Sequence, residues 1–163
     1  MPGEDLGFDK QDPEVGYLPA YIRYSRGRAY EGIGEYFWET IKENSDKIDA
    51  LFISGLYGVA RFTEFIRYYD IDLGDKSTYG KPVYKFWTNI LPQIIVDYAI
   101  NTNVKQIVVL SSYRYLQLLV GLRDQCDSRG ILLKVPYLGS GWEVLTNIGI
   151  KLMETVNKIL KSG

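Results

Sequence analysis

Three short apolar runs, each followed by small polar residues and then by a helical pattern, constrain the fold of this 163-residue chain most strongly. The runs are Ala50–Ile53, Ile107–Leu110 and Ile131–Val135. Continuous apolar runs of this length are typical of strands that are covered on both faces of a parallel sheet. Their alternation with helices predicts an α/β fold. We therefore expect a three-layer α/β/α architecture with a mainly parallel sheet.

Apolar residues at three- and four-residue spacing predict the helices, which we expect over residues 33–44, 83–98, 113–125 and 142–160. Pro92 lies inside the second of them and should kink it or split it in two. Residues 1–18 contain glycine, proline and acidic residues without apolar periodicity, so they are expected to form an extended arm. Residues 19–163 then form a single domain.

The charge and the residue types present exclude several classes of function. Nineteen Lys and Arg residues against 20 Asp and Glu residues give a net charge of -1, so the chain is not a globally basic nucleic-acid binder and any anion site must be local. The absence of histidine excludes Ser-His-Asp and Cys-His catalysis and His-containing zinc sites. We expect neither a metal nor a cofactor.

The single cysteine, Cys126, cannot form an internal disulfide, and no signal-peptide pattern precedes the domain. Both features indicate a cytoplasmic protein. No apolar stretch approaches the roughly 18 residues that cross a bilayer, so no membrane partner is expected. Asp124 and Asp127 beside Cys126 disfavour its thiolate, so it is not expected to be a nucleophile.

Small residues follow all three expected strands. They are Ser54-Gly55, Ser111-Ser112 and Gly139-Ser140-Gly141. Ligands of open parallel sheets bind outside the carboxyl ends of the strands, so these turns are expected to meet at one binding edge. The free N–H groups of the third turn, directly before the last helix, could hold a phosphate or carboxylate. The alternative is that these are ordinary turn and N-cap residues.

Two aspartates, Asp70 and Asp72, alternate along a Tyr-Asp-Ile-Asp-Leu segment and should point the same way. A pair of like carboxylates can raise the pKa of one member enough for general acid–base catalysis. The alternative is a solvated strand face.

The only concentrated basic patch lies in residues 19–30, where Arg23, Arg26 and Arg28 are interleaved with tyrosines. Contact with phosphate is one interpretation, and stacking of the arginines on neighbouring rings is the other. The chain has 14 tyrosines. They suit half-buried packing positions, or alternatively a stacking surface for bases.

The residues around the first strand end resemble the YaaA family of peroxide stress proteins. The family motif begins roughly with Ser-Gly-Leu-Tyr-Gly-Val-Leu-Arg-Pro, and residues 54–62 read Ser-Gly-Leu-Tyr-Gly-Val-Ala-Arg-Phe. The motif ends with an acidic residue, Met and Gly, to which Asp72-Leu73-Gly74 corresponds. Residues 80–87 are similar to the family's Gly-Lys-x-Leu-Tyr-x-Phe-Trp, and residues 26–33 and 110–115 are similar to two further segments. Phe62 and Tyr68 replace family prolines, and Asp70 replaces an arginine.

The resemblance implies a cytoplasmic role in peroxide stress, with DNA binding proposed for family members. We therefore expect the sheet edge to bind a phosphate-bearing nucleotide or nucleic acid, with Arg61 pairing with phosphate and Tyr57 stacking on a base. The expected ligand-binding residues are Ser54, Gly55, Tyr57, Gly58, Arg61, Tyr69, Ser111, Ser112, Gly139, Ser140 and Gly141. The residues expected to contact nucleic acid are Arg23, Arg26, Arg28 and Arg67.

Two other classes of function stay open at this point. One is an enzyme that acts on a nucleoside or nucleobase by N-glycosidic or hydrolytic chemistry, with Asp70 or Asp72 as general base and Ser54 or Ser112 as a positioning group. The other is a partner-binding scaffold whose tyrosines form an interface.

Overall fold

The computed structural model describes residues 17–77 and 80–162, which form two compact units. The first unit comprises Ile53–Val59 and Tyr69–Tyr137, and the second comprises residues 17–52, 60–68 and 138–162. Most of the predicted N-terminal arm, residues 1–16, lies outside the described residues. The single domain expected from residue 19 stays a prediction.

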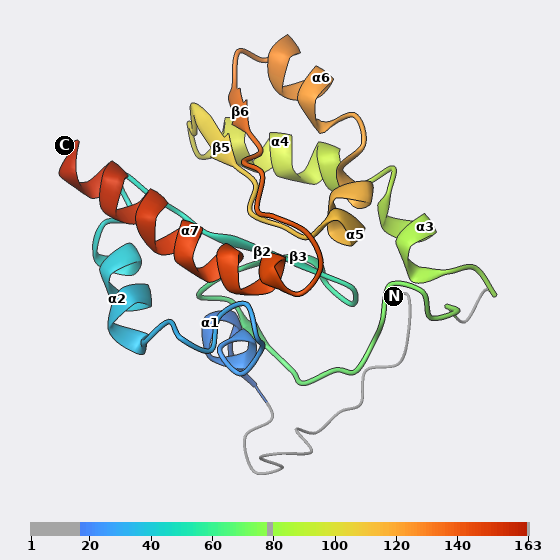
Figure 1. The fold of residues 1–163 in the computed structure, drawn as a ribbon. Coiled ribbons are helices and arrows are strands. Elements are labelled where there is room, and N and C mark those ends of the chain that lie inside the picture. The colour runs from blue at the N-terminus through green and yellow to red at the C-terminus, as the bar shows by residue number, and fades with distance from the viewer. Residues whose placement is uncertain (1–16, 78–79, 163) are drawn as a thin grey trace. The chain divides into compact units, whose positions relative to one another are not determined.

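The first unit is built from helices around a short parallel strand pair (Figure 1). Strands β5 (Gln106–Val108) and β6 (Leu132–Lys134) pair in parallel, with Ile107 opposite Leu133. Helix α4 (Leu91–Asn101) packs against α6 (Leu122–Ser128), and α6 packs on β6. The strands expected at Ile107–Leu110 and Ile131–Val135 are confirmed as strands with slightly different bounds, and they run parallel.

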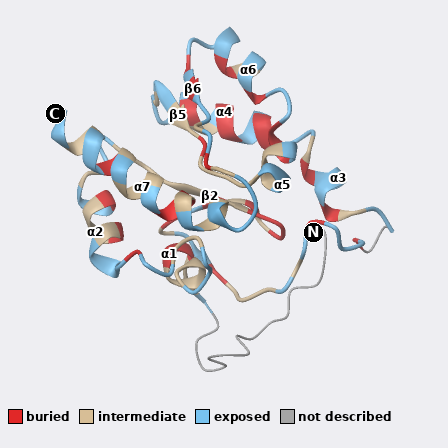
Figure 2. Cartoon of the chain, in the orientation of Figure 1, coloured by how far each residue is buried: buried red, intermediate tan, exposed pale blue. Residues whose placement is uncertain are grey.

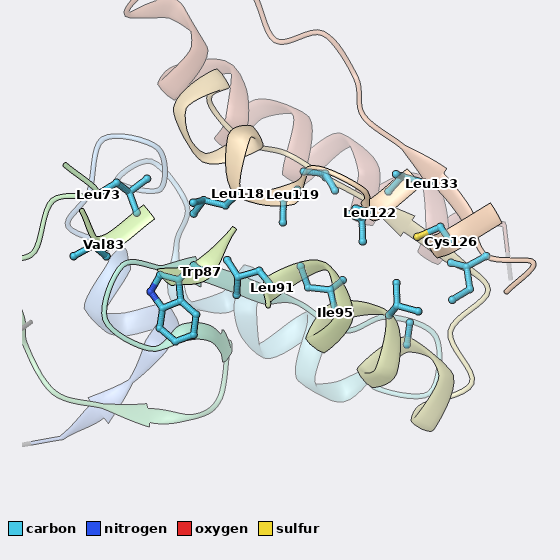
Figure 3. Packing of buried hydrophobic residues seen from close by; sticks show 14 residues of the cluster. Leu73, Val83, Trp87, Leu91, Ile95, Leu118, Leu119, Leu122, Cys126 and Leu133 are labelled. Carbon is cyan, nitrogen blue, oxygen red and sulfur yellow. The ribbon is translucent and has the colours of Figure 1, made fainter. Parts of the chain in front are cut away.

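The core of this unit lies where α3 (Val83–Trp87) and α4 face the 3-10 helix η1 (Gln117–Leu119) and α6. Figure 3 shows the side chains of Leu91 and Ile95 pointing toward those of Leu118 and Leu122. Leu91 and Leu118 have no exposed surface. Burial of such a leucine contributes about 1.5–3 kcal/mol to stability.

Proline and glycine set the helix boundaries in this unit. Pro92 occupies the second position of α4, where its missing N–H removes no helical hydrogen bond, so the expected split of the helix over residues 83–98 is confirmed. The helix expected over residues 113–125 is wrong as one element. The chain runs from α5 (Tyr113–Leu116) into η1 and leaves the helical conformation at Val120, whose ψ is 129°. Gly121, in a left-handed conformation with φ +86°, then precedes α6.

Aromatic side chains pack together in the core of the second unit. Figure 2 shows buried and half-buried residues on each of its three helices. The unit contains α1 (Ala20–Tyr24), α2 (Glu35–Glu43) and α7 (Glu143–Lys161), and β1 (Leu18–Pro19) pairs antiparallel with β4 (Phe65–Ile66). Trp38 is 2% exposed, and its ring centroid lies 5.4 to 6.4 Å from those of Tyr21, Tyr30, Phe52 and Phe62. Tyr21 and Tyr30 are thus packing residues.

The first expected strand does not join the parallel pair. Among the described residues, all strand pairing occurs in three two-stranded sheets, and β2 (Leu51–Ser54) pairs with β3 (Gly58–Arg61). Only three residues connect β2 to β3, a link too short for parallel strands, so this pair is a hairpin. The mixed α/β class is confirmed, but the three-layer arrangement with a mainly parallel sheet is not.

Candidate functional site

The turn after β2 is formed by residues of the conspicuous Ser-Gly-Leu-Tyr-Gly stretch. Ser54 is fully buried, and its Oγ accepts a hydrogen bond from the Tyr57 N–H at 3.0 Å. This side-chain bond satisfies a backbone donor and holds the chain reversal. Gly58 then begins β3 at φ +73°, where a side chain would be strained. The stretch therefore ends a hairpin strand and not, as expected, a parallel one.

Trp87 holds this turn from α3. Its Nε1–H donates to the Gly55 carbonyl oxygen at 2.7 Å in a buried hydrogen bond. Its ring also lies against Gly58, where an added Cβ would approach the ring carbon Cζ3 to 2.5 Å. Gly58 is thus required both by its backbone conformation and by the ring beside it.

Two tyrosines contact the buried serine, and a third lies near one of them. The Ser54 and Tyr69 hydroxyls are hydrogen bonded at 2.7 Å, and the Tyr57 and Tyr69 rings meet edge to face with centroids 5.9 Å apart. Tyr115 on α5 completes the group: burial, and secondarily the neighbouring Tyr69 and Asp72, raise the pKa of its phenol. We call Ser54, Tyr57, Tyr69 and Tyr115 the tyrosine cluster. It combines ring faces and hydroxyls on segments far apart in sequence.

Asp72 connects the segment after Tyr69 to the start of α5. Its Oδ1 accepts the Gly74 N–H at 2.8 Å, and its carboxylate forms a two-armed ion pair with Arg114, with Nη1 at 2.9 Å from Oδ2. The Gly74 N–H, together with Arg114, holds the pKa of Asp72 below its ordinary value. The sequence had suggested that a pair formed by Asp70 and Asp72 would raise the pKa of one member for general acid–base catalysis. The pKa of Asp72 is lowered instead, because its carboxylate faces a cation and an amide donor. A catalytic role for either aspartate stays a prediction.

Two of the three expected turns lie in the first unit. Ser112 precedes α5, and its carbonyl oxygen accepts the N–H groups of Tyr115 and Leu116 at 3.1 and 3.0 Å. The Ser111 hydroxyl donates to the same carbonyl at 3.3 Å. The Asp72–Arg114 pair joins α5, which follows this turn, to the segment that carries Tyr69.

The third turn belongs to the second unit, so its convergence with Ser54 stays a prediction. Gly139 and Gly141 have φ +94° and +61°. Asn147 of α7 donates from Nδ2 to the Leu138 carbonyl at 2.8 Å, and a Cβ on Gly139 would lie 3.3 Å from the same nitrogen. The backbone conformation of this turn and its contact with α7 therefore favour glycine here, whatever role Ser140 has.

Arg61 also lies in the second unit, where it is paired with a carboxylate. Its Nε donates to Asp49 Oδ2 at 3.0 Å and to Oδ1 at 3.1 Å, and its backbone N–H donates to Glu64. The side chain retains 44% exposure. A phosphate at Arg61 would have to compete with Asp49, so the expected pairing with phosphate stays a prediction.

The four arginines expected to contact nucleic acid have different surroundings. Arg23 donates to the Ile66 carbonyl at 3.2 Å, whereas Arg26 is exposed. The guanidinium groups of Arg67 and Arg28 lie 5.2 and 4.7 Å from the ring centroids of Tyr17 and Trp142. Stacking on rings, the alternative interpretation of the basic patch, therefore describes Arg28.

Sequence reasoning missed Trp87 and Arg114 as parts of this site. Neither residue is among those expected to bind a ligand or nucleic acid. Both residues lie in segments that resemble family motifs, residues 80–87 and 110–115, and that shared resemblance was the available signal. No group of three or more acidic or cysteine side chains suited to a metal, and no helix long and apolar enough to cross a membrane, occurs within residues 17–77 and 80–162.

Comparison with known proteins places these features in a family. A family model described as peroxide stress protein YaaA matches residues 6–131. No curated protein and no solved structure matches the chain. The matched range contains the turn after β2, Trp87, the Asp72–Arg114 pair and the tyrosine cluster. The chain belongs to the YaaA family of peroxide stress proteins.

Proposed function

We propose that this YaaA-family protein binds a phosphate-bearing nucleotide or nucleic acid at the tyrosine cluster and Arg114, as a cytoplasmic component of the peroxide stress response that protects DNA. One observation carries the proposal. The segments Ser54–Gly58, Tyr69–Gly74 and Ser112–Tyr115, which are distant in sequence and all resemble family motifs, are joined by the Ser54–Tyr69 hydrogen bond and the Asp72–Arg114 ion pair.

The side chains at this place suit the two parts of a nucleotide. Tyr57 is half-buried and supported by Tyr69, and a supported ring of this kind stacks well on a base. Arg114 has 58% of its side chain exposed. Asp72 engages one N–H on each terminal nitrogen and orients the guanidinium, whose other donors suit a phosphate. Arg114 thus takes the phosphate role that the sequence had suggested for Arg61.

Charge sets the conditions of the test. With a net charge of -1, the chain as a whole does not attract polyanions, so affinity must come from local stacking and a few phosphate contacts. Binding should therefore be measured at low salt, by fluorescence anisotropy. The two probes are a thymidine oligonucleotide of about 15 nucleotides, within the range that single-strand sites cover, and a fluorescent adenine mononucleotide.

Tyr57→Ala should weaken binding of at least one probe by about 1–3 kcal/mol, the range for loss of one base stack, whereas Tyr57→Phe should retain most of the affinity. Arg114→Gln should weaken binding and reduce its salt dependence. Arg123→Gln on α6 is the matched control, because Arg123 is exposed, lies in the same unit and changes the net charge equally. Absence of binding of both probes by the unchanged protein would refute the proposal.

A further inference from the structure

Trp142 in the second unit is unusually exposed for a tryptophan. It precedes α7 and is 76% exposed, whereas Trp38 and Trp87 are 2% and 9% exposed. An indole side chain is normally buried over most of its surface, because it is the largest apolar group in proteins. Trp142 also lies beyond residues 6–131, so the family match does not account for it.

A cation lies over the indole ring. The Arg28 guanidinium carbon is 4.7 Å from the ring centroid, within the range of a cation–π interaction, and Arg28 itself is exposed. This contact covers one face of the ring, and with 76% of Trp142 exposed much of the rest faces solvent. A planar group can therefore approach the indole while remaining next to a positive charge.

Close packing fixes the segment of Arg28 against α7. Gly149 of α7 lies so near to Ala29 that an added Cβ would be 2.5 Å from the Ala29 carbonyl oxygen and 3.7 Å from Ile33 Cδ1. Arg28 and Trp142 are thus held on two segments that contact each other, and little ordering is needed before a ligand binds.

The positive charge over the ring favours one kind of ligand. No acidic residue occurs between Tyr17 and Tyr30, a range that contains Arg26 as well as Arg28, although Glu31 and Glu143 follow the two key residues in sequence. A flat aromatic group that carries a nearby negative charge fits this combination of an open ring and a guanidinium. A nucleic-acid base with its phosphate has that chemistry.

We propose that Trp142 and Arg28 form a contact site for single-stranded nucleic acid, in which a base stacks on the indole and Arg28 contacts the adjacent phosphate. The class of ligand rests on the function proposed above, and the site is additional to the tyrosine cluster. Base faces are hidden in a duplex, so the site discriminates single strands from duplexes.

The test compares three probes at low salt: a thymidine oligonucleotide of about 15 nucleotides, a duplex of the same length and a mononucleotide. Trp142→Ala should weaken binding of the single strand about 5- to 150-fold and leave binding of the duplex unaffected, because the base faces of a duplex cannot stack on the indole. Tyr36→Ala on α2 is the matched control, because Tyr36 is an 85% exposed ring in the same unit. Its affinity should equal that of the unchanged protein.

Two further readouts distinguish stacking from a structural effect. Stacking should quench the tryptophan fluorescence of the unchanged protein, and Trp142→Phe should abolish that quenching while retaining part of the affinity. Arg28→Gln should lower the slope of log K against log salt by about 0.7, the value for one phosphate contact of a single strand. Lys47→Gln, an exposed charge in the same unit, should leave the slope unchanged.

Equal single-strand affinity of Trp142→Ala and the unchanged protein would overturn this inference, as would equal losses for single strand and duplex. If Tyr57→Ala then still lost affinity, the proposed function would stand without the second site. If the unchanged protein bound neither a strand nor a mononucleotide, both proposals would fail together.

Discussion

The substitution Gly58→Ala tests how the Ser-Gly-Leu-Tyr-Gly turn is held in place. Gly58 has φ +73°, and the left-handed conformation costs a residue with a Cβ about 1–2 kcal/mol. The added Cβ would also lie 2.5, 2.8 and 2.9 Å from three carbons of the Trp87 ring. Forcing a methyl group into such a packed position costs about 1–3 kcal/mol. The two terms together predict a loss of about 2–5 kcal/mol in the free energy of unfolding.

Gly121→Ala is the matched control for the backbone term. Gly121 lies in the same unit at φ +86°, and nothing lies within 4 Å of the position of its Cβ. It should therefore lose only the conformational term of about 1–2 kcal/mol. Both variants are compared by urea unfolding followed by circular dichroism.

The loss in free energy of unfolding should be larger for Gly58→Ala than for Gly121→Ala. The difference between the two losses is the cost of the clash between the added methyl group and the Trp87 ring. In a Trp87→Phe background, which removes the outer ring carbons, this difference should shrink toward zero, as a double-mutant cycle would show. If Gly58→Ala loses no more stability than Gly121→Ala in the unchanged background, Trp87 does not hold the turn as described.

Three further predictions concern the tyrosine cluster and Asp72. Tyr69→Phe removes the hydroxyl bonded to buried Ser54 and should cost about 1 kcal/mol in urea unfolding, but much less in a Ser54→Ala background; equal costs would contradict the bond. Folding lowers the pKa of Asp72, so its carboxylate contributes fully to the stability of the fold above the unfolded-state pKa of 3.8. This contribution is lost as pH falls through the lower pKa of the folded state. Asp72→Asn should thus be less stable than the unchanged protein at neutral pH and equally stable in strong acid. The raised pKa of Tyr115 predicts that stability falls as pH rises above 10, where the unfolded phenol ionises first, and Tyr115→Phe should weaken that fall in alkaline unfolding.

Local patterns were sufficient for most of the helices and for one strand pair, but not for residues 113–125, where one expected helix is three elements. The apolar period of α7 extends through Ile148 and Val156, both buried, and the split at Pro92 follows from its missing N–H. The apolar run at Leu51–Ser54 was also a strand. We expected this strand in the parallel sheet, whereas it pairs with β3 in a hairpin. A Ser-Gly pair after a strand is compatible with either a turn into a helix or a hairpin, so it did not distinguish the two arrangements. The second glycine, Gly58, favoured the hairpin.

The candidate site was only partly predictable, for a different reason. The expected residues Ser54, Tyr57 and Tyr69 are in contact, but the expected cations were taken from the basic patch and from Arg61. The pairing of Asp72 with Arg114 joins residues 42 positions apart. Periodicity and turn chemistry carry no information on contacts of that range, whereas shared membership of family motifs did point to these segments.

The most direct test of the central claim is an amide chemical-shift map recorded while a mononucleotide, and separately a short thymidine oligonucleotide, is titrated into the isotope-labelled protein. We predict that at least one ligand shifts the amides of Ser54–Gly58, Tyr69–Gly74 and Ser112–Tyr115, because these segments carry the tyrosine cluster and Arg114. If neither ligand shifts these amides, or if all shifts fall outside the three segments, the cluster is not the binding site.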